Sequence, residues 1–356
     1  MIASLTIQNF RGFRNLRLEG LRPATLIAGT NGVGKTSLLE AILLHLAPHN
    51  PTLTVTLNPL RGFEVQPADA EEIWGWLFTD RDTRRTIEIA SVDVAGKRLE
   101  VRITLAPPIL PTFSGSTTGN AIYSSIPGPV LTAPTQKELQ IESWDQAGRN
   151  GRSRAFLTSE GVKVEWNQVG EFPPGGLLAA RGRSTRDDAI RFSKVEEERR
   201  TGGLVPALRL LEPRLTGLSV LATAGVPMIH ADIGIGKLLP LPYLGEGIGR
   251  LLSILLALEA ARGGILLVDE VENGFHHSIL PNVWSAIRSA CDQWKVQIIA
   301  TTHSFECIRA AHATLSFGDN PMLRLVRLDR RGEQIVPTLY EADTLEVAIE
   351  EGLEVR

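Results

Sequence analysis

Gly29-Thr30-Asn31-Gly32-Val33-Gly34-Lys35-Thr36 is the stretch of sequence that decides the fold, because it fits the pattern G-x-x-x-x-G-K-[ST]. Glycines let the backbone curl so that successive N–H groups point into one concavity, which suits a chain of phosphates. Lys35 is expected to reach the β- and γ-phosphates of a nucleotide, and the Thr36 hydroxyl to ligate Mg²⁺, a hard cation that prefers oxygen. The residues expected to line this phosphate loop are Gly29, Asn31, Gly32, Gly34, Lys35, Thr36 and Ser37.

The residues on either side give the loop the context that it requires. Ala24 to Ala28 is a short, mostly apolar run, which predicts a buried strand that ends at the loop. Ser37 to Leu46 has helical periodicity and Pro48 follows it, so a helix is expected to begin here and aim its positive end at the phosphates. Towards the N-terminus, alternation in Leu5 to Gln8 predicts a strand, with Leu16 to Leu18 as its hairpin mate.

A second strand end carries two carboxylates. Ile265 to Val268 is a continuous apolar run, and Asp269 and Glu270 follow it. Ligands of open α/β sheets bind at the carboxyl ends of the strands, so we expect Asp269 to hold the Mg²⁺ through water and Glu270 to orient and polarise the attacking water. An ordinary strand followed by an acidic turn has the same pattern, but the pairing with the phosphate loop favours a catalytic site.

A third strand end carries a histidine. Val296 to Ala300 predicts another buried strand, and Thr301-Thr302-His303-Ser304 follows it. Since this strand end is expected at the same edge of the sheet, His303 is predicted to donate a hydrogen bond to the γ-phosphate and to sense its loss. The alternative is a structural histidine. The expected catalytic residues are therefore Lys35, Glu270 and His303.

The last part of the chain alternates between helices and short apolar strands. Helices are predicted for Leu251–Arg262, Leu280–Trp294 and Phe305–Ala311, and a final hairpin for Leu323–Tyr340, turning at Asp329–Glu333. Such alternation predicts a parallel sheet covered on both faces. The fold class that we expect is α/β, with a parallel P-loop sheet flanked by helices, an antiparallel β subdomain and an irregular insertion.

The middle of the chain, from Asn50 to about Gly203, has a different character. Thr86–Leu105 and Ala155–Trp166 each alternate around a glycine-containing turn, and both predict hairpins. Pro107–Pro134 is rich in Pro, Gly, Ser and Thr, which predicts a loop or partial disorder because it cannot bury enough apolar surface. Arg181–Arg200 is charged with both signs, and this favours a solvated helix with its lead-in loop.

The order of these motifs resembles the ABC ATPase superfamily. Asn9-Phe10-Arg11-Gly12-Phe13 is similar to the start of RecF, SMC and OLD-type ATPases. Asp269-Glu270-Val271-Glu272-Asn273-Gly274-Phe275-His276-His277 resembles the D-E-x-E-N-G-L-H stretch of OLD-like and AAA-labelled ATPases that are encoded with phage-defence nucleases. The resemblance covers the two ends of the chain and not its middle. It implies an ATPase head that uses ATP and Mg²⁺ and works as a head-to-tail homodimer.

The resemblance also implies a contact from the second subunit. Leu244–Arg250 occupies the place of the L-S-G-G-Q signature, which contacts the γ-phosphate bound to the other subunit. Gly247 and a helix beginning at Ile248 match this signature. Gly245 replaces its serine, so one hydroxyl contact is missing. The alternative is a glycine-rich loop that merely begins a core helix.

Three further positions match the family less specifically. Arg11 matches a residue that reaches toward the nucleotide, although a surface arginine without a role is equally compatible. His276 matches the D-loop position, and a surface histidine without a role is equally compatible. Gln66 is a candidate for the Q-loop glutamine, at a loose spacing.

Two departures from the family narrow the subclass. SMC-type proteins place a long coiled coil between the phosphate loop and the signature, whereas this interval is rich in Pro and Gly and lacks sustained heptads. OLD proteins carry a C-terminal Toprim nuclease, whereas the residues after His303 predict a hairpin and a short helix. We therefore expect an ATPase without its own nuclease, with a split ATPase domain at residues 1–50 and 204–356 and a second subdomain at residues 51–203.

Composition limits the cellular context. The formal net charge of -3 gives no global attraction to nucleic acid or to anionic membranes. Cys291 and Cys307 lie in apolar contexts that predict buried free thiols, and the longest apolar run, Leu251–Ala261, is too short to cross a membrane. A cytoplasmic protein without a membrane partner is expected. Six arginines of the middle segment allow two interpretations: they form a DNA-facing patch, or they are solvated loop charges. We favour the second for Arg149, Arg152, Arg154, Arg181, Arg183 and Arg186.

The leading functional hypothesis is an ABC-type switch or motor in DNA-linked phage defence, with a separate Toprim-like nuclease as partner and DNA as a possible one. The alternatives are a RecF-like ATPase of DNA repair and recombination, a transporter subunit, and a nucleotide-switched scaffold with little turnover. The N-F-R-G-F start and the middle segment argue against a transporter, and Glu270 argues against a scaffold.

Overall fold

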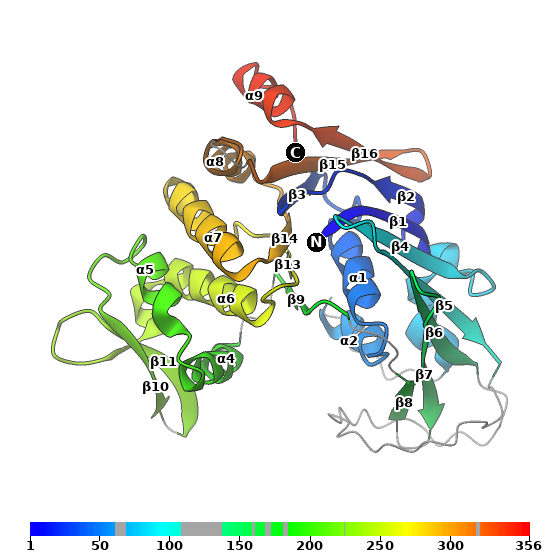
Figure 1. Ribbon diagram of the computed structural model, residues 1–356, viewed down its shortest axis with the longest axis horizontal. Coiled ribbons are helices and arrows are strands. Elements are labelled where there is room, and N and C mark those ends of the chain that lie inside the picture. Colours follow the sequence, from blue (N-terminus) through cyan, green and yellow to red (C-terminus); the bar gives the residue numbers. More distant parts are fainter. Residues whose placement is uncertain are drawn as a thin grey trace.

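The computed structural model describes residues 1–60, 69–107, 137–158, 161–167, 172–180, 184–223, 225–317 and 321–356. Within these residues the strands form a six-stranded sheet, a seven-stranded antiparallel sheet and a three-stranded sheet. Figure 1 shows the six-stranded sheet, called the central sheet below, in the middle of the molecule. The seven-stranded sheet, called the antiparallel sheet below, lies to its right, and the three-stranded sheet lies at the lower left (Figure 1).

The central sheet has the order β16-β15-β3-β14-β13-β9. Its strands are β3 (Ala24–Gly29), β9 (Gly175–Leu178), β13 (Ile265–Val268), β14 (Gln297–Thr301), β15 (Leu323–Arg331) and β16 (Gln334–Tyr340). All neighbours are parallel except β15 and β16, which form a hairpin. Alternate residues of β13 enter the two cores on either side, Leu266 and Val268 in one and Ile265 and Leu267 in the other. Both faces are covered, and this explains the continuous apolar run in the sequence.

Helices cover both faces of the central sheet (Figure 1). One face carries α1 (Lys35–Leu46), and the other carries α6 (Glu246–Ala260), α7 (Leu280–Trp294) and α8 (Phe305–Leu315). The C-terminal helix α9 (Ala342–Glu350) packs against α8 and β15. The helix α7 buries one face only, with Val283, Ile287 and Trp294 among its core residues, as its amphipathic sequence predicts.

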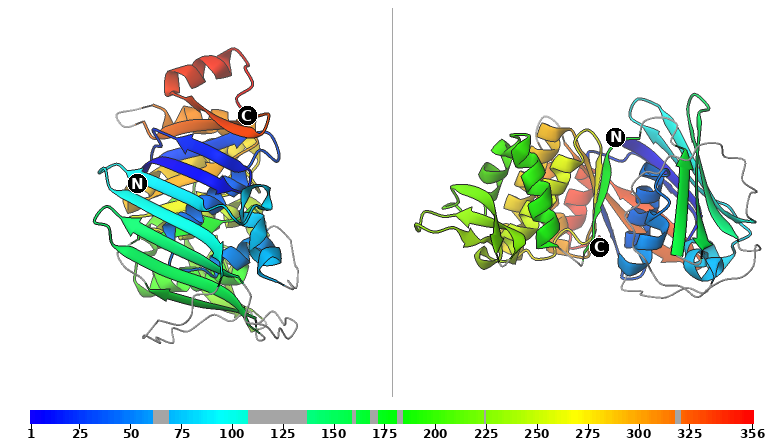
Figure 2. Two further views of the ribbon diagram at one scale, coloured as in Figure 1. Left: turned by 90° about the vertical axis from the view of Figure 1, so that its right-hand side faces the viewer. Right: turned by 90° about the horizontal axis from the view of Figure 1, so that it is seen from below.

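The antiparallel sheet has the order β2-β1-β4-β5-β6-β7-β8. Its strands are β1 (Ile2–Phe10), β2 (Phe13–Leu18), β4 (Ile87–Asp93), β5 (Arg98–Ala106), β6 (Glu138–Asp145), β7 (Asn150–Thr158) and β8 (Gly161–Asn167). The helix α1 lies between this sheet and the central sheet, and the view from below in Figure 2 shows the three layers. Residues from Ser37 to Leu46 are all buried as a result, which is why α1 is apolar on nearly every side. Two shorter helices follow α1 in the chain: α2 (Leu53–Leu60) packs against α1, and α3 (Ala70–Trp74) packs against α2 and β6.

A smaller lobe lies beyond α6, on the side away from the antiparallel sheet (Figures 1 and 2). It consists of α4 (Thr185–Glu197), α5 (Leu204–Leu208), β10 (Gly217–Thr223), β11 (Val226–Asp232) and β12 (Leu239–Pro240). The expectation that α4 is simply solvated is wrong, because its Ala189, Phe192 and Val195 are buried in the same core as α6. Charged residues fill its outer face, and they hid this apolar stripe in the sequence.

The α/β fold class and the expected order of strands and helices are confirmed, and Cys291 and Cys307 are buried free thiols as expected. The structure differs from the expectations in three places. The helix α6 begins at Glu246, earlier than expected. Its first turns contain Gly247 and Gly249, and glycines are unfavourable in helices, so the sequence pattern did not indicate this start. The strand β6 follows the Pro-rich stretch and was not expected. The strand pairs β1–β4 and β9–β13 cross the expected division at residues 50/51 and 203/204, so the division does not coincide with the sheets.

Some expectations lie outside the described residues. They concern Gln66, Arg181, Arg183, the turn at residues 159–160 and the stretch from residue 108 to 134. Among the arginines of the possible DNA patch that the structure describes, Arg152 and Arg154 lie in β7 and Arg149 lies in the turn between β6 and β7, and all three pair with carboxylates. Arg149 pairs with Asp145, Arg152 with Glu142, and Arg154 with both Glu138 and Glu165. These charges are therefore balanced within the antiparallel sheet. The favoured interpretation as solvated loop charges holds for Arg149, which lies in the turn before β7 with a side chain 59% exposed, whereas Arg152 and Arg154 lie in the strand β7 and not in a loop.

Candidate nucleotide site

The carboxyl edge of the central sheet brings the predicted site residues together. The strand β3 leads into the phosphate loop, β13 leads into Asp269 and Glu270, and β14 leads towards His303. These strands are parallel neighbours in the order β3-β14-β13, so their carboxyl ends meet at one edge. The helix α1 begins at Lys35, directly after the loop, with its N-terminus at this edge.

Positive φ angles shape the phosphate loop. Gly29, Gly32 and Gly34 have φ of 138°, 76° and 112°, in the region that favours glycine. Two of these positions also lack room for a side chain. A Cβ at Gly29 would lie 2.5 Å from the carbonyl oxygen of Leu328, and a Cβ at Gly34 would lie 3.1 Å from Cζ of Phe13. The loop conformation therefore requires glycines on both backbone and packing grounds.

The ammonium group of Lys35 lies over the loop. Its Nζ donates hydrogen bonds to the carbonyl oxygens of Gly29 at 2.6 Å and Thr30 at 3.2 Å. Burial lowers the pKa of Lys35 below its usual value, and the carboxylates at the sheet edge oppose this shift. Those carboxylates are Glu270, Glu272 and Asp269. The lysine thus joins the loop to the acidic edge of the sheet.

Two oxygen donors meet beside the start of α1. The Thr36 hydroxyl donates to the carboxylate of Asp269, with its Oγ1 3.2 Å from Oδ1 and 3.0 Å from Oδ2. Thr301 Oγ1 donates a 2.6 Å hydrogen bond to Asp269 Oδ1 and fixes that carboxylate. Hydroxyl and carboxylate oxygens are ligands that Mg²⁺ prefers, so these residues fit the ion. Asn31 is exposed on the loop, whereas Ser37 is buried in α1.

Glu270 follows Asp269 in a strained conformation. Its φ of 47° is uncommon for a residue other than glycine, and such strain is found most often at functional sites. Two contacts hold it: its backbone N–H donates to Thr301 Oγ1 at 2.8 Å, and its Oε2 accepts a 2.7 Å hydrogen bond from Asn273 Nδ2. The carboxylate of Glu270 is therefore fixed at the edge of the sheet, close enough to Lys35 to affect its pKa.

His303 projects from the same edge, with half of its side chain exposed (50%). Glu272 contacts both the ring and the backbone N–H of His303. The Oε1 atom of Glu272 lies 3.1 Å from His303 Nδ1 and accepts a 2.9 Å hydrogen bond from the His303 backbone N–H. The side chain of His303 is thus placed by a carboxylate that comes from the Asp269–His276 segment.

Arg11 lies in the turn between β1 and β2, with φ of 49°. Its Nε is 2.9 Å from Glu40 Oε2 on α1, and the two side chains are only 11% and 2% exposed. The guanidinium carbon also lies 5.7 Å from the centroid of the Phe10 ring. Arg11 is therefore not a surface arginine, since it ties this turn to the helix of the phosphate loop. A nucleotide contact from Arg11 stays a prediction.

The signature-like segment lies on the other side of the central sheet from α1. The N-cap of α6 is Gly245 with φ of 104°, and Gly247 follows in the first turn. A Cβ at Gly247 would lie 3.2 Å from the carbonyl oxygen of Gly274, so this helix start packs closely on the segment after Glu270. The helices α1 and α6 cover opposite faces of the central sheet (Figure 1). His276 is exposed and its Nδ1 lies 2.9 Å from Ser278 Oγ.

Four residues that lie in the quoted motifs but received no role from the sequence complete the site. They are Arg250, Glu272, Asn273 and Thr301. Arg250 is buried in α6 and donates to the carbonyl oxygens of Asp269 at 3.1 Å and Ala179 at 3.2 Å. The position of Thr301 directly after a predicted strand was a signal for its role. No pattern in the sequence indicates the contact of Arg250, because it depends on how α6 crosses the sheet.

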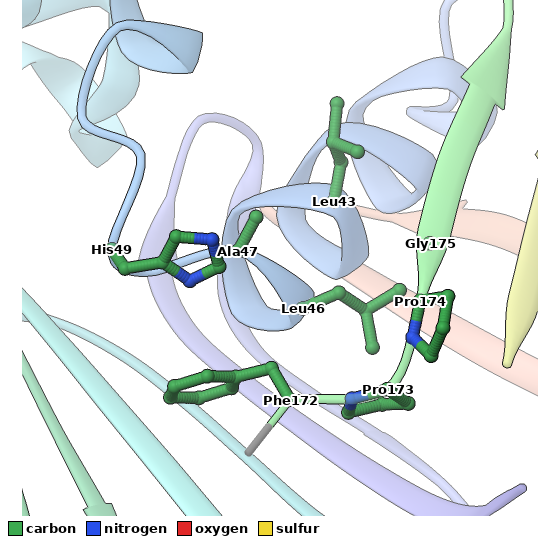
Figure 3. A pocket seen from close by; sticks show the side chains of 8 residues that line it. All are labelled: Leu43, Leu46, Ala47, His49, Phe172, Pro173, Pro174 and Gly175. Atoms are coloured by element: carbon green, nitrogen blue, oxygen red, sulfur yellow. The ribbon is translucent and has the colours of Figure 1, made fainter. Parts of the chain in front are cut away.

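A cavity of about 290 Å³ lies elsewhere, near the C-terminal end of α1 (Figure 3). Leu46 of α1 points towards Pro174 and Gly175, and Leu43 and Pro173 also line the cavity. The rings of His49 and Phe172 close it, with their centroids 5.5 Å apart, and burial lowers the pKa of His49. This cavity contains none of the site residues described above, so it is not the nucleotide site.

Two negative findings apply to the described part of the chain. Of the helices there, none combines the length and the apolar character that a bilayer crossing demands. Groups of three or more His, Cys, Asp and Glu side chains arranged for a metal ion are also absent from those residues.

Family models match most of this chain. The model of a family described as "AAA domain, putative AbiEii toxin, Type IV TA system" matches residues 112–308, and a model described as "AAA domain" matches residues 4–108. A Helicobacter pylori protein named ATP/GTP phosphatase is 22% identical over 98% of this chain and 98% of its own length. The DNA replication and repair protein RecF of Rickettsia prowazekii is 49% identical over 41 residues, but these are 12% of this chain and 11% of that protein.

A solved structure has the same fold. The crystal structure of an Smc head bound to the C-winged helix domain of ScpA has a TM-score of 0.50 with this chain, at 12% sequence identity. The match covers 98% of this chain and 99% of the Smc head chain. At this identity the likeness concerns the fold alone, and it agrees with the central sheet, its helices and the antiparallel sheet described above.

Proposed function

Because this chain belongs to the family described as "AAA domain, putative AbiEii toxin, Type IV TA system", we propose that it couples ATP hydrolysis to a second polypeptide in DNA-linked phage defence. The chain is a P-loop ATPase of the ABC class, and it hydrolyses ATP. Hydrolysis takes place at the interface of a head-to-tail homodimer, with Mg²⁺ as the cofactor. The nuclease that acts with it is a separate polypeptide of the Toprim-like type.

The hydrogen-bond network around Asp269 is the observation that carries the catalytic part of this proposal. Thr36 and Thr301 bond its carboxylate, and Thr301 also receives the backbone N–H of Glu270. One threonine therefore fixes both acidic residues relative to the phosphate loop. Prearranged polar groups of this kind stabilise charge that develops in a transition state without any cost of reorganisation.

Each predicted residue has a role in this arrangement. The backbone N–H groups of the loop and the N-terminus of α1 bind the phosphates, which displace the Gly29 and Thr30 carbonyls as partners of Lys35. Glu270 orients and polarises the attacking water at the γ-phosphate. His303 donates a hydrogen bond to the same phosphate. Asn31 and Ser37 contribute further loop contacts, and Arg11 acts on the loop through Glu40 and α1.

Thr36 and Asp269 would hold the Mg²⁺ ion of a bound nucleotide. When bound, the ion neutralises phosphate charge and aligns the β- and γ-phosphates for transfer. The chain's own part is to keep the two ligands in place, and Thr301 does this for Asp269.

The position of the signature-like segment supports the dimer. Gly245 and Gly247 open α6 on the face of the sheet opposite α1, so a γ-phosphate contact from this helix needs a second copy of the chain. The N-terminus of α6 offers N–H groups and a positive end for that contact, although Gly245 provides no hydroxyl. In the dimer each chain would complete the site of the other.

The family description supports the biological part of the proposal. It names a toxin of a toxin–antitoxin system, and such a system has two components. The sequence predicts one metal site, which the Mg²⁺ of bound ATP would occupy, whereas cutting a phosphodiester usually needs paired metals a few Å apart. A nuclease on a separate polypeptide reconciles these two points. The short match with RecF favours DNA repair as the second candidate, which predicts tight binding of duplex DNA by the ATP-bound dimer.

Turnover by the purified chain tests the catalytic proposal. Wild-type protein with Mg²⁺ and ATP should release phosphate, and Glu270→Gln should lower the rate on the order of 100-fold or more, because a positioned base contributes that much. The matched control is Glu306→Gln, an exposed carboxylate close to His303 in sequence that bonds Ser304 instead. Equal rates for the wild type and Glu270→Gln would remove Glu270 from the site.

Partner capture tests the biological proposal. The isolated chain should not cut plasmid or linear DNA with Mg²⁺ and ATP. Pulled down from its native host, it should bring a nuclease whose retention differs between Glu270→Gln and Lys35→Ala. DNA cleavage by the isolated chain that does not depend on ATP would contradict the separate nuclease.

A further inference from the structure

Glu272 lies in the site without a role in the chemistry described so far. It is 9% exposed, and it follows Asp269 and Glu270 on the segment that leaves β13. One of its oxygens, Oε1, serves both the backbone N–H and the Nδ1 atom of His303. The other oxygen, Oε2, is buried and has no hydrogen-bond partner among the residues that the structure describes.

A buried carboxylate with one unpartnered oxygen destabilises a protein, since the lost hydration costs on the order of 1–3 kcal/mol or more. A leucine or glutamine at residue 272 would avoid much of that cost. The contact with His303 gives a reason for keeping a negative charge there. In pairs of a carboxylate and a histidine, the carboxylate fixes the ring orientation, decides which nitrogen carries the proton, and stabilises the protonated ring.

We propose that Glu272 is a positioning residue, which holds a proton on His303 Nδ1 and turns His303 Nε2 towards the third phosphate of the nucleotide. This inference rests on the proposed function, because it concerns the same site. It adds that the histidine acts as a charged donor: with Nδ1–H directed at Glu272, a hydrogen bond from Nε2 to a phosphate oxygen requires a second proton on the ring.

The proton count of this arrangement is simple. The ring carries one proton on Nδ1 and one on Nε2, and its single positive charge lies between the Glu272 carboxylate and the phosphate oxygens. No proton is transferred and no bond is made or broken. Hydrogen bonds with a charged partner are roughly twice as strong as neutral ones, so removing the charge of Glu272 should weaken the contact of His303 with the phosphate.

A double-mutant cycle tests whether Glu272 acts through His303. The variant Glu272→Gln keeps the size of the side chain and an acceptor for the His303 backbone, and it should lower kcat for ATP about tenfold. In a His303→Gln background the same change should have no further effect, because residues that act through one contact are not additive. Glu306→Gln should leave kcat unchanged. Additive losses from Glu272→Gln and His303→Gln would overturn the proposal.

Imidazole nitrogen NMR provides a readout that a merely structural role would not change. The signals of His303 are assigned by their loss in His303→Gln. In Glu270→Gln protein with ATP and Mg²⁺, both ring nitrogens of His303 should carry protons, and adding Glu272→Gln should leave only one of them protonated. A His303 ring that is neutral in the first protein, or unchanged in the second, would refute the inference.

The two readouts also separate this inference from the proposed function. If the wild type fails to hydrolyse ATP, the function is wrong whatever the ring signals show. If hydrolysis depends on Glu270 but the cycle is additive, the ATPase assignment stands and Glu272 has no part in it.

Discussion

The stability of the layer that contains α1 is predicted to depend on pH through His45. This histidine lies in the last turn of α1, is fully buried, and has its Nε2 2.7 Å from Ser91 Oγ on β4. Burial lowers the pKa of His45 from 6.5 to about 4, although a hydrogen bond with the Ile89 backbone opposes the shift. The folded protein therefore keeps this ring neutral at pH values where the unfolded chain protonates it.

The sign and size of the effect follow from these two values. Between pH 6.5 and about 4 the unfolded chain binds a proton that the folded protein excludes, so the free energy of unfolding falls as the pH drops. Above 6.5 His45 has no such effect, and below about 4 the loss is complete. At about 1.36 kcal/mol for each unit of pKa, the shift from 6.5 to about 4 amounts to roughly 3 kcal/mol.

Urea unfolding of the wild type and of His45→Gln, followed by tryptophan fluorescence, measures this loss. Glutamine keeps an amide that can bond Ser91 but has no proton to gain. The variant should therefore lose less stability than the wild type when the pH falls from about 7 to about 4.5, by roughly 2 kcal/mol. The two proteins share their carboxylates, so the contribution of those groups to the pH dependence cancels in the difference. Stability curves that run parallel over this range would refute the assignment of the acid sensitivity to His45.

Three further predictions concern the site itself. Lys35→Ala removes a charged partner of the phosphates, so calorimetry should show ATP affinity reduced by about 10- to 100-fold in a folded protein; unchanged affinity would mean that the loop does not bind phosphate. With ATP, light scattering should show more dimer for Glu270→Gln than for Glu270→Gln combined with Gly247→Arg, provided that both melt at similar temperatures, and equal dimer would remove the signature-like segment from the interface. Thr301→Val leaves Asp269 and the Glu270 N–H each without one partner, so the free energy of unfolding should fall by about 1–3 kcal/mol and kcat should fall with it; a variant with unaltered kcat would show that Thr301 does not position the acids.

Much of this site could be predicted because strand order translates directly into position. Once Ala24–Ala28, Ile265–Val268 and Val296–Ala300 are taken as parallel strands, their carboxyl ends must share one edge, and the residues after them must be close. The structure brings those strand ends together as expected. Pattern and spacing were sufficient to predict which residues meet at this edge, because the path of the backbone alone decides it.

The contacts of individual side chains were beyond the sequence patterns. Arg11 and Glu270 both have positive φ, and for a residue other than glycine no pattern indicates this. The direction of the Arg11 side chain towards Glu40 depends on that backbone conformation. The strand β9 was missed for another reason: Gly175-Gly176-Leu177-Leu178 is short and glycine-rich, and it becomes a strand only because β13 offers it a partner.

The position of α1 between two sheets also decides how far the protein can be shortened. Residues 1–50 and 204–356 contain every side chain that we expect at the phosphates, and this suggests a minimal catalytic fragment made from those two segments. In the folded molecule the strands β4 to β7 shield α1 from water, and His45 bonds directly to Ser91 of β4. Removing those strands would expose leucine-sized side chains of α1 at about 1.5–3 kcal/mol each, against a typical total stability of about 5–15 kcal/mol. The middle of the chain therefore folds as one unit with the phosphate loop. A shortened protein without the antiparallel sheet should lose the folded loop, and catalysis with it.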